Sequence, residues 1–267
     1  MVKGVPNVLR AVTWLFVAVT LIFVLAPLIV VAGVSVSESQ FIAFPPTGFT
    51  FRWFFAIFES SAYLGALGTS LKLAVLVTIT ATVIGAGAAI AINRRRLPGS
   101  GVLAGLFLSP LILPSIIFAI GLLMLWSATV GPVSFSALWL GHTVIALPYV
   151  IRTTLAVLTD SDPFLEEAAR TMGAGRWQRI RHVVLPQCAP GLAAGAFFAF
   201  NISFDEAVIA LFLRTPDLVT LPIQIYNQLE FSPDPTVAAV STLMMGLTIL
   251  LIAVIDRLLG IQRFVGN

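Results

Sequence analysis

Charged side chains are scarce in this sequence of 267 residues. Lys, Arg, Asp and Glu make up 10% of it and hydrophobic residues 58%, against about 25% and about 45–50% in an average soluble domain. So few charges cannot cover the surface of a soluble domain of this length. The composition therefore excludes an ordinary water-soluble protein and predicts that much of the surface faces lipid.

Cysteine and histidine are nearly absent as well. Cys188 is the one cysteine, which excludes an intramolecular disulfide framework. His142 and His182 lie far apart, and neither has a nucleophile and a carboxylate at a recognisable spacing, so we expect structural roles for both. The phosphate-binding pattern G-x-x-x-x-G-K-[ST] is missing too. We therefore expect no catalysis, metal or cofactor in this chain.

Binding of nucleic acid is not expected either. The formal net charge is only +3, and the basic residues are scattered along the sequence. A nucleic-acid-binding surface requires a concentrated basic patch. The distribution of the charges is more informative than their sum.

Six long apolar segments predict six membrane-spanning helices, because about 20 apolar residues cross a hydrocarbon core of about 30 Å. The segments are continuous and lack the period-two alternation of barrel strands. The predicted fold class is therefore all-α, a polytopic membrane protein with one transmembrane domain over residues 1–267. The expected spans are residues 11–34, 65–92, 101–126, 136–158, 190–213 and 237–259.

Three prolines fall inside the expected third and fourth spans: Pro110, Pro114 and Pro148. Each removes one hydrogen bond of its helix and can bend it. A bent helix can line a cavity, but a kink can also serve packing alone, and the sequence leaves both interpretations open.

The basic residues predict the orientation, because cytoplasmic loops carry an excess of Lys and Arg. With the N-terminus inside, the outer loops receive only Arg52 and Arg214, and Lys72 falls within a span. We therefore expect a multi-pass protein of the inner (plasma) membrane with both termini in the cytoplasm. The basic residues on the inner side are then Lys3, Arg10, Arg94, Arg95, Arg96, Arg152, Arg170, Arg176, Arg179, Arg181, Arg257 and Arg263.

The inner loop between the fourth and fifth spans, residues 160–186, is predicted to contain two short helices. Ser161 or Asp162 can cap the first one, and Pro163 fits its first turn, where an N–H would be unpaired. Glu166 and Glu167 follow near the positive end of the helix dipole. These features are typical of a helix N-terminus.

The first of these helices is predicted to carry an apolar stripe and to end at Gly173. The stripe consists of Phe164, Ala168 and Met172, at helical spacing, with Leu165 and Ala169 beside them. A second, basic helix is expected over residues 175–184, ended by Leu185 and Pro186. The two helices would meet at a glycine bend.

The loop also carries a known sequence pattern. It reads Glu167-Ala168-Ala169, then Gly173 after three residues, then Val183-Val184-Leu185-Pro186 after nine more. This resembles the EAA loop of ABC importer permeases, E-A-A-x3-G-x9-I-x-L-P, and departs from it only in Val183 at the Ile position. The resemblance implies docking on a cytoplasmic ATPase through Glu166, Glu167, Ala168, Ala169, Met172, Gly173, Leu185 and Pro186. An exposed apolar stripe between charges suits a helix that binds in a groove.

An alternative stays open for this loop. An amphipathic helix can lie on the inner leaflet instead, attracted to anionic lipid through Arg176, Arg179 and Arg181.

The resemblance extends to residues 202–206, Ile-Ser-Phe-Asp-Glu, and residues 220–226, Thr-Leu-Pro-Ile-Gln-Ile-Tyr. Both are similar to the spermidine/putrescine-type permeases, and the likeness covers nearly the whole chain. It implies a type I ABC importer subunit that is not itself an enzyme. Its implied partners are an ATPase dimer that binds ATP and Mg²⁺, a related second permease in a hetero- or homodimer, and an external substrate-binding protein. The implied solute is a polyamine, with opines, amino-acid derivatives and other small solutes as alternatives.

Two adjacent carboxylates, Asp205 and Glu206, are predicted to lie inside the fifth span. A carboxylate within a membrane helix is costly and is therefore a candidate for function. The two residues can line the path of a cation, or Asp205 can form a structural pair with Lys72 at a similar depth. Both interpretations remain open.

Two rival functions deserve comparison. In a secondary transporter, Asp205 or Glu206 would be the ion site, but the six spans show no inverted repeat. A membrane scaffold without transport would leave the carboxylates and the span prolines unexplained. We therefore predict an ATP-driven permease that alternates between outward and inward access.

Overall fold

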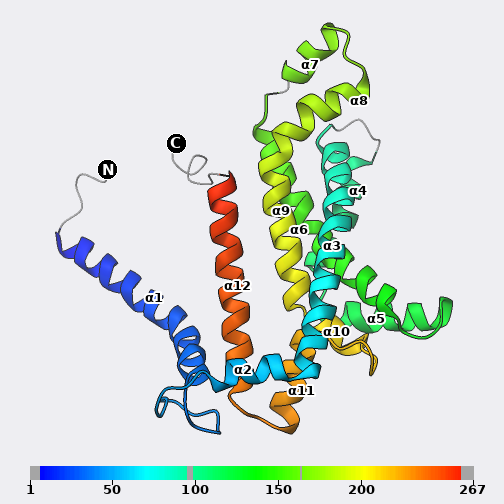
Figure 1. The fold of residues 1–267 in the computed structure, drawn as a ribbon. Helices are drawn as coiled ribbons and strands as arrows, with labels where there is room; N and C mark the ends of the chain where they lie inside the picture. Colours follow the sequence, from blue (N-terminus) through cyan, green and yellow to red (C-terminus); the bar gives the residue numbers. More distant parts are fainter. Residues whose placement is uncertain (1–6, 95–98, 163, 260–267) are drawn as a thin grey trace. The chain divides into compact units, whose positions relative to one another are not determined.

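The computed structural model describes residues 7–94, 99–162 and 164–259, shown as a ribbon in Figure 1. Apart from an isolated bridge between Thr215 and Leu218, the regular structure of these residues is helical. Five of the described helices are long and apolar enough to cross a membrane, and a bent pair supplies a sixth if it counts as one span. The predicted all-α class is confirmed.

The contacts divide the chain into two compact units. The first contains α1 (Asn7–Ser35) and α2 (Arg52–Glu59), with the segment Ile225–Leu247 from α11 (Leu221–Phe231) and α12 (Thr236–Leu259). The most apolar stretch of α1 has no buried residue, as expected for a helix whose partners are lipid or another chain. The loop after α1 is anchored where the Trp53 indole N–H donates to the Ser37 carbonyl at 2.8 Å.

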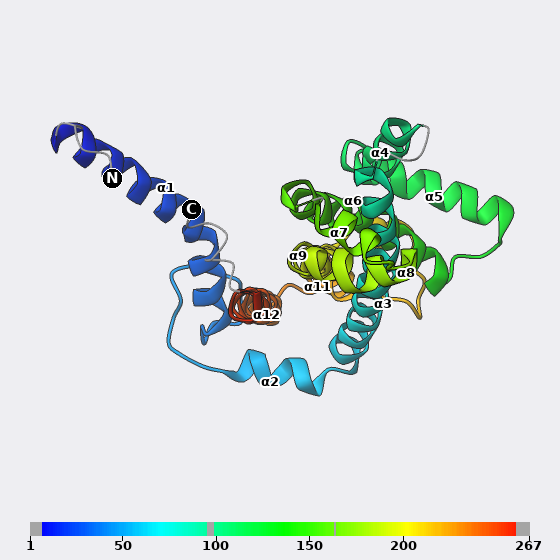
Figure 2. The same ribbon diagram turned by 90° about the horizontal axis from the view of Figure 1, so that it is seen from above.

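The second unit holds the candidate site and is built on three long helices: α3 (Ser61–Asn93), α6 (Phe135–Asp160) and α9 (Leu185–Asp205). Its core includes Leu73 and Val77 of α3, Val150 of α6 and Ala199 of α9. In Figures 1 and 2, α6 and α9 run side by side.

Two glycines of α9 allow this close approach. A side chain at Gly195 would place its Cβ 2.8 Å from Val150 Cα and 2.6 Å from Thr153 Oγ1, and one at Gly191 would lie 2.6 Å from the Thr153 carbonyl oxygen. Small residues at a helix interface are how membrane helices bring their backbones together. The packing therefore depends on the absence of these two side chains.

The expected third span, 101–126, is bent rather than straight. It consists of α4 (Ser100–Leu108) and the 3-10 turn Ser109–Leu111, followed after a break by α5 (Ser115–Thr129), and the two halves meet at 104°. Pro110 lies in the 3-10 turn and Pro114 directly precedes α5, where they interrupt the ladder of helical hydrogen bonds. By contrast, Pro148 lies inside α6, which continues to Asp160.

The expected fifth span, 190–213, is displaced. A continuous helical stretch runs over Arg176–Asp205, and after a break the short α10 (Val208–Phe212) contacts α5 and α6. The prediction that Leu185 and Pro186 end the basic helix is therefore wrong. The turn before them, Ile180–Val184, has π-helical bonding, and such a widened turn accommodates the ring and the missing N–H of Pro186.

Candidate functional site

The first helix of the loop, α7 (Phe164–Thr171), begins as its sequence predicts. The Asp162 carboxylate accepts a hydrogen bond from the Phe164 N–H at 2.9 Å. The Ser161 hydroxyl instead donates to the Leu158 carbonyl at 2.7 Å and closes the end of α6. Asp162 rather than Ser161 therefore caps α7, and the predicted position of Pro163 lies outside the described residues.

The end of α7 is formed by Gly173, whose φ is +88°. The Gly173 N–H donates to the Arg170 carbonyl and the Ala174 N–H to the Ala169 carbonyl, both at 3.0 Å. These two bonds form the Schellman arrangement, in which a left-handed residue satisfies the last carbonyls of a helix. Glycine adopts this conformation at the lowest cost, so the predicted stop at Gly173 is confirmed.

After the turn, α8 (Arg176–Arg179) starts the second helix. The Gly175 N–H donates to the Gln178 side-chain oxygen at 2.8 Å, so the glutamine reaches back over the helix start. Since α8 continues through the π-helical turn into α9, the loop is joined to a long helix without an intervening coil. Leu185 and Pro186 lie within this stretch, and both are exposed.

Large apolar side chains stand exposed on this pair of short helices. Their exposed fractions are 71% for Phe164, 51% for Leu165, 81% for Met172 and 80% for Trp177. We call these four residues the apolar surface of α7 and α8. Exposed groups of this kind mark interaction sites with proteins or membranes.

The EAA residues divide between the two sides of α7. Glu167 and Ala168 are exposed, whereas Ala169 is buried, and α7 contacts α8 and the π-helical turn. The apolar stripe predicted from Phe164, Ala168 and Met172 is exposed in all three members. Trp177 was not among the predicted site residues, because it follows Gly173 and shares no helical spacing with the stripe.

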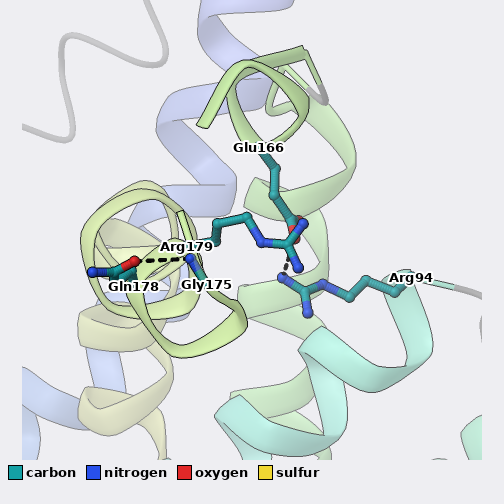
Figure 3. Close-up of polar contacts among 5 residues, drawn as sticks. All are labelled: Arg94, Glu166, Gly175, Gln178 and Arg179. Carbon is teal, nitrogen blue, oxygen red and sulfur yellow. Dashed lines mark hydrogen bonds and ion pairs between the residues drawn. The ribbon is translucent and has the colours of Figure 1, made fainter. Parts of the chain in front are cut away.

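Glu166 lies at the centre of a charged cluster beneath α7. Its Oε1 is 2.8 Å from Arg94 Nη2 and 3.9 Å from Arg179 Nη1, and Figure 3 shows both guanidinium groups approaching this carboxylate. A cavity of about 220 Å³ adjoins the cluster, with Ile90, Leu158 and Val184 among its lining residues. Arg94 and Arg179 were not among the predicted site residues, since no spacing rule relates residue 94 to residue 166.

The two predicted pathway carboxylates have different surroundings. Glu206 follows the last residue of α9, and its Oε1 accepts hydrogen bonds from the Val208 and Ile209 N–H groups at 2.8 and 3.1 Å. It therefore caps α10. Asp205 is the last residue of α9, and its side chain is exposed. The expectation that both residues lie inside one helix is wrong, because the helix ends between them.

Lys72 and Asp205 do not form the ion pair that was one of the two interpretations left open by the sequence. Among the residues that the structure describes, the salt bridges are those of Glu166. The Lys72 ammonium instead lies 4.8 Å from the centre of the Phe135 ring, a cation–π distance. The Asp205 carboxylate therefore has no cationic partner among the described residues.

The remaining candidates for reactive groups are packed in the interior. His142 is fully buried, with Nδ1 3.2 Å from both the carbonyl and the hydroxyl oxygen of Ser203. Cys188 is also fully buried, in a cluster with Ala89 and Ile151. His142 therefore occupies the structural position expected of it, and Cys188 serves as a packing residue.

Comparison with known proteins adds to this geometry. Residues 81–262 match the family described as "Binding-protein-dependent transport system inner membrane component". The chain is 30% identical to the spermidine/putrescine transport system permease protein PotC of Escherichia coli over 90% of both chains. It is 29% identical to the putrescine transport system permease protein PotI of the same organism, over 84% of this chain and 82% of that one.

The fold has solved counterparts. A bacterial alginate ABC transporter, in complex with a periplasmic protein that holds an alginate pentasaccharide, contains a chain with a TM-score of 0.72. The likeness covers 94% of this chain and 93% of that one at 17% sequence identity. The helical fold is that of the permeases of type I ABC importers. This chain belongs to the family of binding-protein-dependent transport system inner membrane components, and it is a non-catalytic, multi-pass permease subunit of the inner membrane.

Proposed function

We propose that the chain forms part of the membrane pathway of an ATP-driven importer and docks on a cytoplasmic ATPase through α7 and α8. The observation that carries this proposal is the apolar surface formed by Phe164, Leu165, Met172 and Trp177. A soluble partner with a hydrophobic groove would bury these side chains, which is the helix-in-groove mode of recognition. At roughly 25 cal/mol per Å² of apolar area, burial of several such groups supports a stable contact.

The alternative, a loop lying on the membrane, is less well supported. A surface helix of that kind is a separate amphipathic element. Here α8 continues directly into α9, and the Schellman turn fixes how α7 leaves it. A loop held in this way by the spans suits transmission of movement to a partner.

The orientation that we propose places both termini and the α7–α8 loop in the cytoplasm. The excess of Lys and Arg on that side supports it. An ATPase docked there would bind the ATP and Mg²⁺, so this chain needs no cofactor of its own. The other proposed partners are a related second permease, in a heterodimer or homodimer, and an external binding protein that delivers the solute.

The solute that we propose is a small cation, most specifically a polyamine such as putrescine or spermidine. The names of the two relatives support this choice, whereas the fold does not decide it, since a structural counterpart carries alginate. Asp205 adds local support. Its carboxylate lies at the C-terminal end of α9, where the helix dipole is also negative. The dipole therefore destabilises the unpaired carboxylate, and both groups together attract a cation.

The proposed mechanism is alternating access. Closure of the ATPase dimer would displace α7 and α8, and α9 would follow because it continues from α8. Rigid-body movement of packed helices is an established way to open a pathway toward one side. Asp205, at the break after α9, would then change its surroundings during the cycle.

Detergent co-purification tests the proposed docking. The wild-type permease pair should retain its partner ATPase, and replacement of Phe164–Gly173 by a Gly/Ser linker should release it. Met172→Glu, which places a charge in the apolar surface, should weaken the contact without changing the yield of the permease pair. Retention of the ATPase by the linker variant would refute the docking role.

A further inference from the structure

Glu166 lies one residue before the EAA sequence, and its carboxylate joins three helices. One oxygen, Oε1, is 2.8 Å from Arg94 Nη2 and 3.9 Å from Arg179 Nη1. Arg94 follows the last residue of α3, Glu166 is on α7 and Arg179 is on α8, as Figure 3 shows. The side chains of Arg94, Glu166 and Arg179 are only 15%, 23% and 13% exposed. Charge-assisted hydrogen bonds in such partly buried positions are stronger than ion pairs on an open surface.

The shorter bond, between Glu166 and Arg94, is the principal one. Arg179 contributes the longer contact, and its Nε is buried without a hydrogen-bond partner among the described residues. Removal of Glu166 would leave two guanidinium groups facing each other in a confined space. The carboxylate is therefore the member on which the other two depend.

The remainder of α7 has few anchors. The helix has eight residues. Among its described residues, Ala169 is the one that is buried. A helix this short is marginal on its own, so its position depends on tertiary contacts. Its contacts with α8 and the π-helical turn connect it to the stretch that becomes α9. The bond to Arg94 connects it to α3, 72 residues away in sequence.

We propose that Glu166, Arg94 and Arg179 form a positioning cluster that fixes α7 to the end of α3. A displacement of α7 by the ATPase is then passed to α3 as well as to α9. This inference rests on the proposed function, and it assigns to Glu166 a task separate from that of the exposed Glu167. Glu167 faces outward, where a partner can reach it, whereas Glu166 faces its own chain.

The experiment compares transport with ATP hydrolysis in the same proteoliposomes, reconstituted with the ATPase, the second permease and the binding protein. Arg94→Gln and Glu166→Gln should each lower the number of spermidine molecules imported per ATP hydrolysed severalfold, because displacement of α7 would no longer be passed to α3. Co-purification of the ATPase should persist, because the apolar surface is intact. Arg94→Lys keeps a cation opposite Glu166 Oε1 and should restore most of the ratio.

Arg181→Gln provides the matched control, since Arg181 is exposed and holds no ion pair within the described residues. This variant should import as many spermidine molecules per ATP hydrolysed as the wild type. In a double-mutant cycle, Arg94→Gln and Glu166→Gln should be non-additive, whereas Arg181→Gln and Glu166→Gln should add.

Two results would overturn the inference. One is a wild-type ratio in both Arg94→Gln and Glu166→Gln. The other is a fall in uptake that merely follows a lower yield of complex, which would mean that the cluster serves folding alone. Failure of the proposed function would appear elsewhere, in a wild-type permease that does not bind the ATPase.

Discussion

Gly173 has the positive φ of a left-handed residue, and apart from its chain neighbours no atom of the described residues lies within 4 Å of where its Cβ would be. A side chain at this position would therefore meet no steric obstacle and would act through the backbone alone. For a residue other than glycine, the left-handed conformation costs about 1–2 kcal/mol. The angle between α7 and α8 thus depends on one residue.

Gly173→Ala should change that angle and lower ATP-driven uptake severalfold, while insertion into the membrane persists. Gly173→Asn should lower uptake less than Gly173→Ala does, because asparagine tolerates the left-handed region better than alanine. Uptake normalised to the amount of membrane-inserted complex measures both. Equal uptake by the alanine variant and the wild type would show that the turn has no role in coupling.

The adjacent carboxylates Asp205 and Glu206 differ in what they contact. Glu206 accepts two backbone hydrogen bonds at the start of α10, whereas Asp205 is exposed at the end of α9. A capping side chain contributes about 0.5–2 kcal/mol to stability. A free carboxylate contributes nothing comparable, and its value would lie in attracting a cation.

Glu206→Ala should therefore lower the unfolding temperature of the complex, whereas Glu206→Gln retains a carbonyl oxygen for the cap and should not. Asp205→Asn should leave that temperature unchanged but reduce spermidine uptake severalfold. Thermal unfolding in detergent and radiolabelled uptake separate the two roles. If Asp205→Asn lowered the unfolding temperature and left uptake unchanged, Asp205 would have a structural role and not a role in transport.

Lys72 and Asp205 form no ion pair in this structure, so substitutions at the two positions should act independently. Since the Lys72 ammonium lies against Phe135, Lys72→Met should not restore any function lost in Asp205→Asn. Uptake by the double variant, compared with both single variants, tests this. Recovery in the double variant would indicate that the two residues pair in another state of the transport cycle.

Residue patterns predicted the local features of the loop and missed its long-range ones. A cap at Ser161 or Asp162 and the stop at Gly173 could be predicted, because both depend on neighbours within a few residues. The bond from Glu166 to Arg94 could not, because it forms only after α3 and α7 are brought together. The different roles of Asp205 and Glu206 were hidden for the same reason, since they follow from where a helix ends.

Among the helices of the second unit, α6 and α9 pack closely against each other at the glycines of α9. Val150 and Thr153 of α6 occupy the space beside Gly195. An added methyl group would force the backbones apart, and overpacking of this kind costs typically about 1–3 kcal/mol.

Gly195→Ala is accordingly expected to lower the unfolding temperature and the yield of folded permease. Gly68→Ala is the matched control, because Gly68 lies in α3 and, outside its own helix backbone, no atom of the described residues lies within 4 Å of its Cβ position. The control should be neutral or stabilising, since alanine favours helix over glycine by about 1 kcal/mol. Similar behaviour of the two variants would exclude a specific role for the close contact.

The prediction of the long helices from sequence was more successful than that of their interruptions. Four of the apolar segments in the sequence coincide with the helices α1, α3, α6 and α12 to within a few residues. The prediction placed the fifth span too late, because Pro186 suggested a helix end that the π-helical turn avoids. Apolar composition continues through the break after Asp205 and through the bend between α4 and α5, so hydropathy alone could not detect either.

At the scale of the whole molecule, orientation in the membrane is the first property to test. The proposed topology places residue 171 in the cytoplasm and residue 232 outside. In a Cys188→Ser background, an impermeant maleimide applied to intact cells should label Ser232→Cys and spare Thr171→Cys until the cells are opened. Both positions are exposed. The reverse labelling pattern would place the EAA loop outside and exclude contact with a cytoplasmic ATPase.

We propose that this permease subunit carries a polyamine inward at the expense of ATP bound by a partner. ATP-dependent accumulation of radiolabelled spermidine and putrescine in proteoliposomes tests it most directly. The vesicles would hold the permease pair with its ATPase, and the external binding protein would be added outside. We predict uptake that requires ATP, the binding protein and intact α7, and that falls in Asp205→Asn. Uptake that persists without ATP and follows an imposed ion gradient would contradict the account.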